Sequence, residues 1–167
     1  MAGEPVSQME NDMTKQTIRK QMRYKIPQFK LALLKEREGE LVEIFTPKDI
    51  DRFVEPLKHF AEEYFVAFHL DCRHRVIGYH EVSHGTISAS LVHPREVFKA
   101  ALLSNAYCLL VAHNHPAGSL TPSNEDLTTT EKLVQVGELI GVPVLDHIIV
   151  SKLGTQSIRE LNPSLFV

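Results

Sequence analysis

The sequence predicts an α/β (α+β) fold in which helices flank a mixed β-sheet. Two observations support this class. Segments rich in β-branched and aromatic residues alternate with segments in which apolar residues recur at helical spacing. In addition, the run YCLLVA, residues 107–112, is short and wholly apolar, as expected of a strand that helices cover on both faces.

The first predicted helix spans residues 46–63, because Thr46 suits a cap position and Pro47 suits the first helical position. Two strands follow it, and the short polar turn DCRHR between them predicts that they pair. Gly141 is a stop signal for a later helix. The other expected elements are strands within 62–71, 75–92, 107–112 and 142–151, and helices within 93–106 and 122–141.

One domain is expected, because 167 residues leave little room for a second hydrophobic core. We expect this domain to span residues 27–167. Residues 1–26 are a polar, basic arm, whose stretch KQTIRKQMRYK contains no acid. The plainer interpretation is a solvated helical or flexible arm, and the alternative is an arm that binds nucleic acid or a partner. The formal net charge of −3 argues against a large basic face.

The chain shows no sign of a membrane span, because no apolar run approaches the roughly 18 residues that a spanning helix needs. We therefore expect no membrane partner. The first residues, MAGEPVSQMENDMTKQ, lack the pattern of a secretory signal, so we expect a cytoplasmic location. Cys72 and Cys108 stand alone, which argues against a zinc finger or a redox dithiol.

The stretch VAHNHPAGSLTPSNED, residues 111–126, concentrates the chemistry of the chain. Side chains alternate along a strand, so His113 and His115 point to the same side beyond the buried apolar run. The next helix begins near Ser123, which brings Asp126 toward the end of the strand. Two imidazoles and one carboxylate could therefore bind a metal ion and leave one tetrahedral position open for water.

The same residues also fit a purely structural interpretation. Ser123 and Asp126 resemble a capping box, in which the Ser123 hydroxyl accepts from a backbone N–H and the Asp126 carboxylate accepts from the backbone N–H of the cap residue. Such a cap stabilises a helix by about 0.5–2 kcal/mol. Taken alone, the stretch SNED favours this cap over a ligand. The cap does not explain the two histidines, and their spacing favours a metal site.

The order His-x-His, seven residues, Ser, two residues, Asp is filled by His113, His115, Ser123 and Asp126. It resembles the motif of the JAMM (MPN-plus, JAB domain) zinc metalloproteases. The stretches VHPREVFKAALLSNAYCLLVAHNHPAG, TPSNEDLTTTEKLVQVGELIGVPVLDHIIV and SIRE look like the bacterial RadC-type branch of that family. The resemblance runs from about residue 62 to 160 and implies a JAB/MPN-like fold with the layered architecture of cytidine deaminases.

The resemblance also implies roles for single residues. One Zn²⁺ per chain would be held by His113, His115 and Asp126, and Ser123 would help to stabilise the oxyanion. The general base would be a glutamate on an upstream strand, a position that Glu63 matches, with Glu62 as the runner-up. Without the resemblance, either glutamate would be read as a solvated acid at the end of the preceding helix. Iron, cobalt or manganese would also accept two imidazoles and a carboxylate.

Other polar residues are weaker candidates. Asp146 and His147 alternate faces on a strand, so at most one of them can face the site. A buried, hydrogen-bonded pair is the favoured interpretation, and orientation of a zinc ligand from behind is the alternative. Five further histidines lack ligand spacing to each other and are expected to be structural or on the surface; they are His69, His74, His80, His84 and His93.

Three functions follow from these observations. The leading prediction is a zinc-dependent hydrolase that cleaves a peptide or isopeptide amide bond through a zinc-activated water, in a peptide or protein substrate that the sequence does not identify. The second is a DNA repair or recombination accessory protein of the RadC type, which makes DNA a candidate partner through the basic arm. The third is a module that keeps zinc only for folding or docking. A homodimer is compatible with the sequence, which does not decide the oligomeric state.

Overall fold

The computed structural model describes residues 42–85 and 92–166, and the fold below refers to this part of the chain. These residues belong to a single compact unit. The predicted basic arm, 1–26, and the predicted domain start at residue 27 lie outside the described residues, so both stay predictions, as does the DNA contact that depends on the arm. Within the described residues, no helix is both long and apolar enough to cross a membrane.

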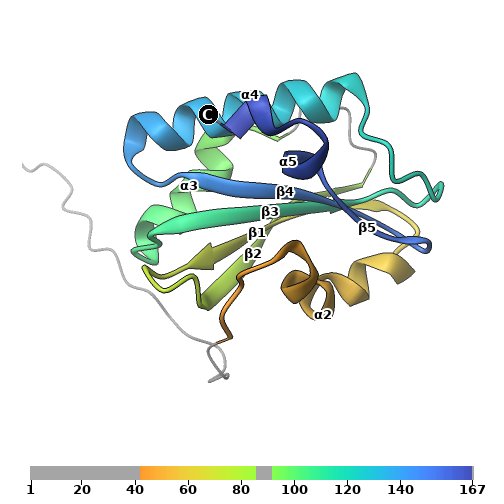
Figure 1. Cartoon of the computed structure of the whole chain (residues 1–167), viewed down its shortest axis with the longest axis horizontal. Coiled ribbons are helices and arrows are strands. Elements are labelled where there is room, and N and C mark those ends of the chain that lie inside the picture. The colour runs from red at the N-terminus through yellow and green to blue at the C-terminus, as the bar shows by residue number, and fades with distance from the viewer. Residues whose placement is uncertain (1–41, 86–91, 167) are drawn as a thin grey trace, which may run out of the picture. The chain divides into compact units, whose positions relative to one another are not determined.

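A five-stranded mixed sheet forms the centre of the fold, with strand order β2-β1-β3-β4-β5 (Figure 1). Strand β1 pairs antiparallel with both β2 and β3, and β4 pairs antiparallel with β5. Strands β3 and β4 are parallel. The mixed sheet predicted from the sequence is therefore confirmed. The strands are β1 (Glu63–Leu70), β2 (Val76–Gly85), β3 (Cys108–Asn114), β4 (Val144–Ser151) and β5 (Gly154–Ser157).

Helices cover both faces of the sheet (Figure 1). One face carries α3 (Pro94–Leu103) and α4 (Asn124–Ile140), with α5 (Ile158–Leu161) and η4 (Pro163–Phe166) beside α4 and β4. The other face carries the 3-10 helix η1 (Pro47–Ile50), α2 (Asp51–Val54) and the 3-10 helix η2 (Glu55–His59).

The continuous helix expected over 46–63 is wrong. The segment is three short helices, and the chain is already extended at Phe60 and enters β1 at Glu63. Pro56 is a physical reason, because proline lacks the backbone N–H for the helical hydrogen bond and its ring clashes with the preceding turn. Glu63 is therefore a strand residue, as the resemblance implied, and not the end of a helix.

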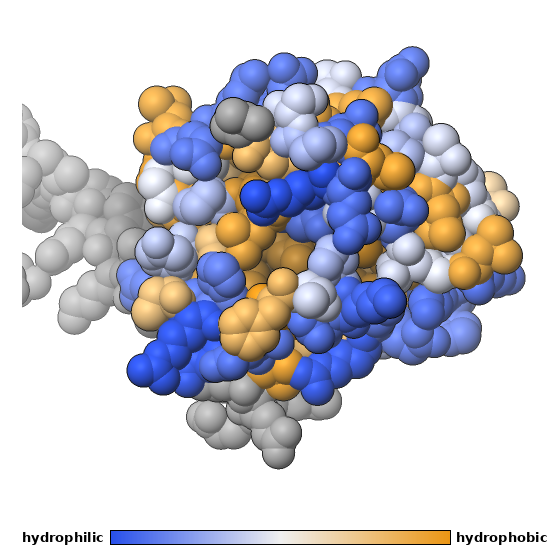
Figure 2. All heavy atoms as spheres, in the orientation of Figure 1, coloured by the Kyte–Doolittle hydropathy of each residue, from blue (hydrophilic) through white to orange (hydrophobic). Residues whose placement is uncertain are grey.

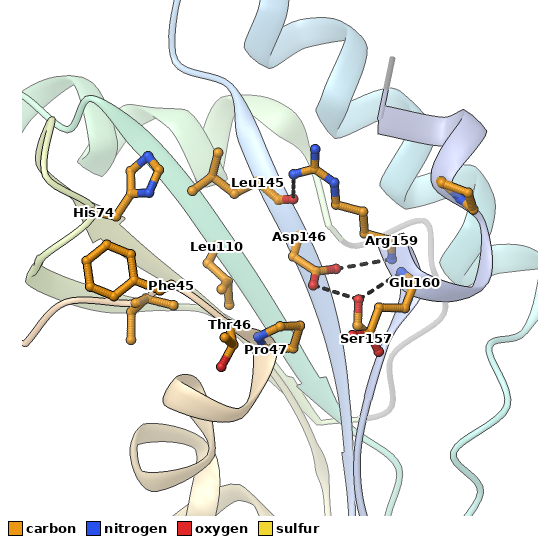
Figure 3. A pocket seen from close by; sticks show the side chains of 12 residues that line it. Phe45, Thr46, Pro47, His74, Leu110, Leu145, Asp146, Ser157, Arg159 and Glu160 are labelled. Atoms are coloured by element: carbon orange, nitrogen blue, oxygen red, sulfur yellow. Dashed lines mark hydrogen bonds between the residues drawn. The ribbon is translucent and has the colours of Figure 1, made fainter.

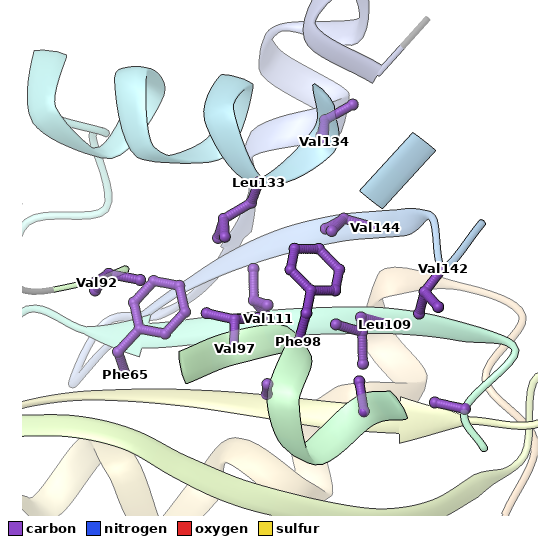
Figure 4. Close-up of a cluster of buried hydrophobic side chains, with 13 residues drawn as sticks. Phe65, Val92, Val97, Phe98, Leu109, Val111, Leu133, Val134, Val142 and Val144 are labelled. Carbon is purple, nitrogen blue, oxygen red and sulfur yellow. The ribbon is translucent and has the colours of Figure 1, made fainter. Parts of the chain in front are cut away.

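The hydrophobic core lies in two layers, one on each face of the sheet. Leu109 and Val111 point toward α3 and α4, where they pack with Phe98 and Leu133 (Figure 4). The alternate residues of β3 pack on the opposite face, against the α2 side. The run YCLLVA is thus buried on both faces, as its composition predicted.

The end of α4 is set by two glycines. Gly141 takes a left-handed conformation with φ +72° and ends the helix, as the sequence predicted. One turn earlier, a Cβ atom on Gly137 would lie 2.7 Å from the carbonyl oxygen of Val142 and 3.3 Å from the Phe98 ring. This close approach lets α4 lie directly against the segment that enters β4.

We expect Gly137→Ala to destabilise the protein by about 1–3 kcal/mol, because the backbone carbonyl of Val142 cannot move away without shifting α4. In an exposed helix the same change would be favourable by about 1 kcal/mol, so the sign is diagnostic. Gly78→Ala is the matched control: its Cβ would meet nothing within 4 Å, and we expect a change within about 0.5 kcal/mol. Urea unfolding measures both, and a stabilised Gly137→Ala variant would contradict the close packing of α4.

Candidate metal centre

Two imidazoles and a carboxylate meet where the carboxyl end of β3 faces the start of α4. His113 lies on β3, His115 directly follows the strand, and the loop after it carries the chain to Asp126 in the first turn of α4. The two Nε2 atoms of the histidines are 2.9 Å apart. Asp126 Oδ1 is 3.1 Å from Nε2 of His113, and Asp126 Oδ2 is 3.4 Å from Nε2 of His115. The structure thus brings together the three residues that the sequence proposed as ligands.

The rings of both histidines are held from behind. His115 Nδ1 lies 3.1 Å from the carbonyl oxygen of Ser119, which can only accept, so Nδ1 carries the proton. The Nε2 of His115 is therefore the nitrogen that is free to bind a proton or a cation. His113 is buried, stacks on the ring of Phe65 at an interplanar angle of 9° and places its Nδ1 2.8 Å from Nε2 of His147.

The capping box predicted at the start of α4 is confirmed. The Asp126 N–H donates to Ser123 Oγ at 3.1 Å, and Asp126 Oδ2 accepts from the Ser123 N–H at 2.7 Å and from its hydroxyl at 2.8 Å. The same carboxylate also faces both imidazoles. The cap and the cluster are therefore compatible, because one side chain serves both.

Electrostatics favour an ionised Asp126. Burial opposes ionisation, but the two imidazoles beside the carboxylate outweigh it and hold the pKa of Asp126 far below its usual value. The hydrogen bond to Asp126 in turn raises the pKa of His115, against burial, and the charge of Glu63 adds to the rise. The centre therefore presents a fixed negative charge to any cation.

The three donors fit a zinc ion. An ion bound tetrahedrally at about 2.0–2.1 Å separates its ligand atoms by about 3.3 Å. The 2.9 Å between the two Nε2 atoms and the 3.1 Å between Asp126 Oδ1 and His113 Nε2 are close to that value, and one ligand atom from each of the three residues lies within 4.8 Å of the others. Within residues 42–85 and 92–166, this is the one cluster of three or more such side chains whose ligand atoms lie this close together. Three protein ligands leave one tetrahedral position for water or substrate.

Glu63 lies at the edge of the same site. It is the first residue of β1 and alternates onto the same face as Phe65, which pairs with His113 in the sheet. The charge of Glu63 also contributes to the raised pKa of His115. Glu62 precedes the strand and is exposed. Glu63 therefore lies on the strand face that carries His113, whereas Glu62 lies outside the strand.

Asn114 is a site residue that the sequence did not single out. It is 1% exposed, its Oδ1 accepts from the Tyr64 N–H at 2.7 Å, and its Nδ2 donates to the carbonyl oxygen of Glu62 at 2.9 Å. Asn114, which lies between the two histidines in the sequence, therefore hydrogen-bonds to the backbone on both sides of Glu63. Its signal in the sequence was a polar residue within a buried strand, next to His113.

Asp146 and His147 face opposite sides of the sheet, as their alternation predicted. Only His147 faces the cluster, and it is fully buried. Asp146 points into a pocket of about 440 Å³ on the α2 side, where it accepts from Ser157 Oγ at 2.6 Å and from the Arg159 N–H at 3.1 Å (Figure 3). Burial raises the pKa of Asp146, although these hydrogen bonds oppose the rise. Figure 2 shows the face of the molecule seen in Figure 1, where hydrophilic and hydrophobic residues are intermixed and apolar residues gather in a hollow near the centre.

The remaining histidines lie away from the cluster. His93 caps α3, with its Nδ1 accepting from the Arg95 N–H, and His74 occupies a turn with φ +57°. His69 and His80 are closer to each other than their sequence spacing suggested: their rings are joined at 2.9 Å between Nε2 and Nδ1. His69 also lies 2.7 Å from the Ser104 hydroxyl, so this pair links the sheet to the end of α3. These contacts support the structural role expected for them.

Known proteins resemble this chain over most of the described residues. The family described as RadC-like JAB domain matches residues 44–163. A UPF0758 protein of Symbiobacterium thermophilum is 45% identical over 120 residues, which are 71% of this chain and 51% of that protein. A UPF0758 protein of Finegoldia magna is 50% identical over 98 residues, 59% of this chain and 44% of that protein. The chain thus spans about half the length of these relatives. With the mixed sheet between helices and a match over residues 44–163, this chain belongs to the RadC-like JAB domain family.

Proposed function

We propose that the chain is a zinc-dependent hydrolase of the JAMM type, which cleaves a peptide or isopeptide amide bond. The observation that carries this proposal is the convergence of His113, His115 and Asp126 at one point, with Glu63 on the adjacent strand. A half-buried carboxylate held ionised between two imidazoles is suited to a divalent cation. The three-ligand set leaves a position for water, as catalytic zinc sites do.

Each residue would have a defined task. Zinc at this site would act as a Lewis acid and lower the pKa of a coordinated water toward about 7. Glu63 would accept the proton of the attacking water and return it to the leaving amine nitrogen. Asn114 would hold the backbone around Glu63 so that its carboxylate stays beside the imidazoles.

Ser123 would add a hydrogen-bond donor for the oxyanion. In the structure its hydroxyl donates to Asp126 Oδ2, and it is exposed at the rim of the cluster. It would have to turn this proton toward the oxyanion during the reaction. The Ser123 N–H would still hold Asp126 Oδ2, so the carboxylate would not lose its support.

Metal content is the first test. We expect about one zinc per chain in wild-type protein purified without added metal, and a loss of zinc in His113→Ala and Asp126→Asn, because each removes one of three ligands. His84→Ala is the control, since its side chain is 53% exposed and lies outside the cluster. Elemental analysis of the purified proteins measures the content. A wild-type protein that takes up no zinc even when zinc is supplied would refute the proposal.

Glu63→Gln tests the general base. We expect this variant to keep its zinc and its stability but to lose hydrolysis of amide substrates, because a carboxamide cannot accept the proton. Glu62→Gln is the matched control and should stay close to wild type. The assay is cleavage of a panel of fluorogenic peptides and isopeptide-linked lysines. Equal behaviour of Glu63→Gln and wild type, combined with unfolding on zinc removal, would instead favour a module that keeps zinc for folding or docking.

Ser123 needs two variants because it also caps α4. Ser123→Gly keeps the cap to within a few tenths of a kcal/mol, whereas Ser123→Ala costs about 0.5–2 kcal/mol of stability. Both lack the hydroxyl, so we expect turnover to fall about 10²–10³-fold in both while zinc content stays at wild type. Thermal unfolding and turnover are measured together. Wild-type turnover in Ser123→Gly would show that the residue is a cap alone.

A further inference from the structure

Behind His113 lies a buried chain of hydrogen-bonding groups that returns to the helix of Asp126. His113 Nδ1 is 2.8 Å from His147 Nε2, His147 Nδ1 is 2.6 Å from Thr130 Oγ1, and Thr130 Oγ1 is 2.6 Å from the carbonyl oxygen of Asp126. Thr130 and His147 are fully buried, and His113 is 4% exposed. This series of hydrogen bonds thus runs from β3 through β4 to α4, and these elements lie side by side in Figure 1.

The direction of each hydrogen bond can be assigned from its far end. The Asp126 carbonyl can only accept, so the single hydroxyl proton of Thr130 points to it. Thr130 Oγ1 then has only lone pairs for His147, so His147 Nδ1 carries a proton and donates. A second proton on the His147 ring would place a charge at a fully buried position, so Nε2 is a lone pair.

The same logic fixes the tautomer of His113. Because His147 Nε2 accepts, His113 Nδ1 must donate, and His113 Nε2 is left as a lone pair aimed at His115 and Asp126. His115 reaches the same tautomer through the Ser119 carbonyl. His113 has the imidazole of His147 in the place of such a carbonyl. An imidazole can be either donor or acceptor. His147 therefore defines the tautomer of His113 only because Thr130 defines the tautomer of His147.

We infer that Thr130 and His147 are positioning residues for the metal centre, which hold His113 in the tautomer whose Nε2 is free to bind a cation. The inference rests on the proposed zinc function. Phe65 adds a steric restraint, because its ring stacks on His113 and meets His147 edge-on with centroids 5.2 Å apart. The turn of α4 that presents the Asp126 carboxylate to the cation also supplies, through its backbone carbonyl, the acceptor that orders the chain.

Without this chain, His113 could carry its proton on Nε2 and donate it to Asp126 Oδ1, 3.1 Å away. Zinc binding to His113 would then require that this proton leave Nε2 and that the ring change to the Nδ1–H tautomer. Loss of such a partner behind a ligand typically weakens metal affinity 10–100-fold. We expect this loss in Thr130→Val, which keeps the shape of the side chain but removes the hydroxyl, and in His147→Leu.

Two substitutions serve as matched controls. Thr130→Ser keeps the hydroxyl and should bind zinc nearly as wild type does. Thr128→Val removes a hydroxyl that makes the same bond to the carbonyl four residues earlier, Asn124, but on the exposed side of α4, so it should also leave zinc affinity unchanged. His147→Gln offers a rescue, because its amide can accept from His113 and donate to Thr130.

The experiment has two readouts on the full chain. Zinc affinity is measured by competition with a chromophoric chelator, and the tautomers of ¹⁵N-labelled histidines are read by NMR in the metal-free protein. The inference predicts an Nδ1–H tautomer for His113 in wild type and Thr130→Ser, with loss of that tautomer and 10–100-fold weaker zinc binding in Thr130→Val. Thermal unfolding of the metal-free proteins checks that the variants stay folded.

Two results would overturn the inference. If Thr130→Val kept the zinc affinity and the His113 tautomer of wild type, Thr130 and His147 would have no positioning role. The proposed zinc function would still stand. An Nε2–H tautomer of His113 in metal-free wild type would contradict the assigned directions. Failure of wild type to bind zinc would refute the proposed function itself, and it would be recognised independently of the tautomers.

Discussion

The carboxylate of Asp126 is the group on which the site depends. Its Oδ2 closes the capping box with Ser123, which fixes where α4 begins, and its two oxygens face the imidazoles of His113 and His115. The same side chain therefore fixes both the start of α4 and the position of the third candidate ligand. A shift of the helix start by one residue would rotate the carboxylate by about 100° around the helix axis and remove it from the imidazoles. The N-terminal end of the helix dipole also favours the negative charge that a cation needs.

The sheet supplies the complementary constraint from the other side of the site. β3 is apolar on both faces over most of its length, so it cannot slide in register without exposing core residues. The antiparallel pairing with β1 places Phe65 opposite His113, and Glu63 lies two residues before Phe65 on the same face. The polar residues thus sit at the end of the strand, where hydrophobic packing fixes their backbone but does not have to bury a charge without partners.

Much of this arrangement could be predicted from local patterns. The buried strand, the helix stop at Gly141 and the cap at Ser123 each depend on residues adjacent in the sequence, and each was found. The break of the first helix at Pro56 and the short strand β5, whose residues GTQS have no apolar alternation, were missed because pairing with β4 rather than composition forms that strand. For Asp146 and His147, orientation of a zinc ligand from behind was an alternative interpretation, but the sequence did not show which ligand would be contacted. Thr130 and Asn114 were missed because they act through contacts between elements far apart in the sequence, which the pattern of one strand does not reveal.

The number of donors and the buried polar groups around them suit the proposed catalytic zinc site better than a structural one. A structural zinc site is closed by four protein ligands, whereas three donors of this kind converge here in the part of the chain that the structure describes. Burying His113 and His147 costs free energy unless each polar atom is paired, and each contact found behind them pairs a donor with an acceptor. A core that needed only stability could fill the same space with apolar side chains at lower cost. Retaining an ordered polar chain behind one ligand is therefore better explained by a demand on that ligand's tautomer, and such a demand arises when a site must bind a cation and still leave a position open for chemistry.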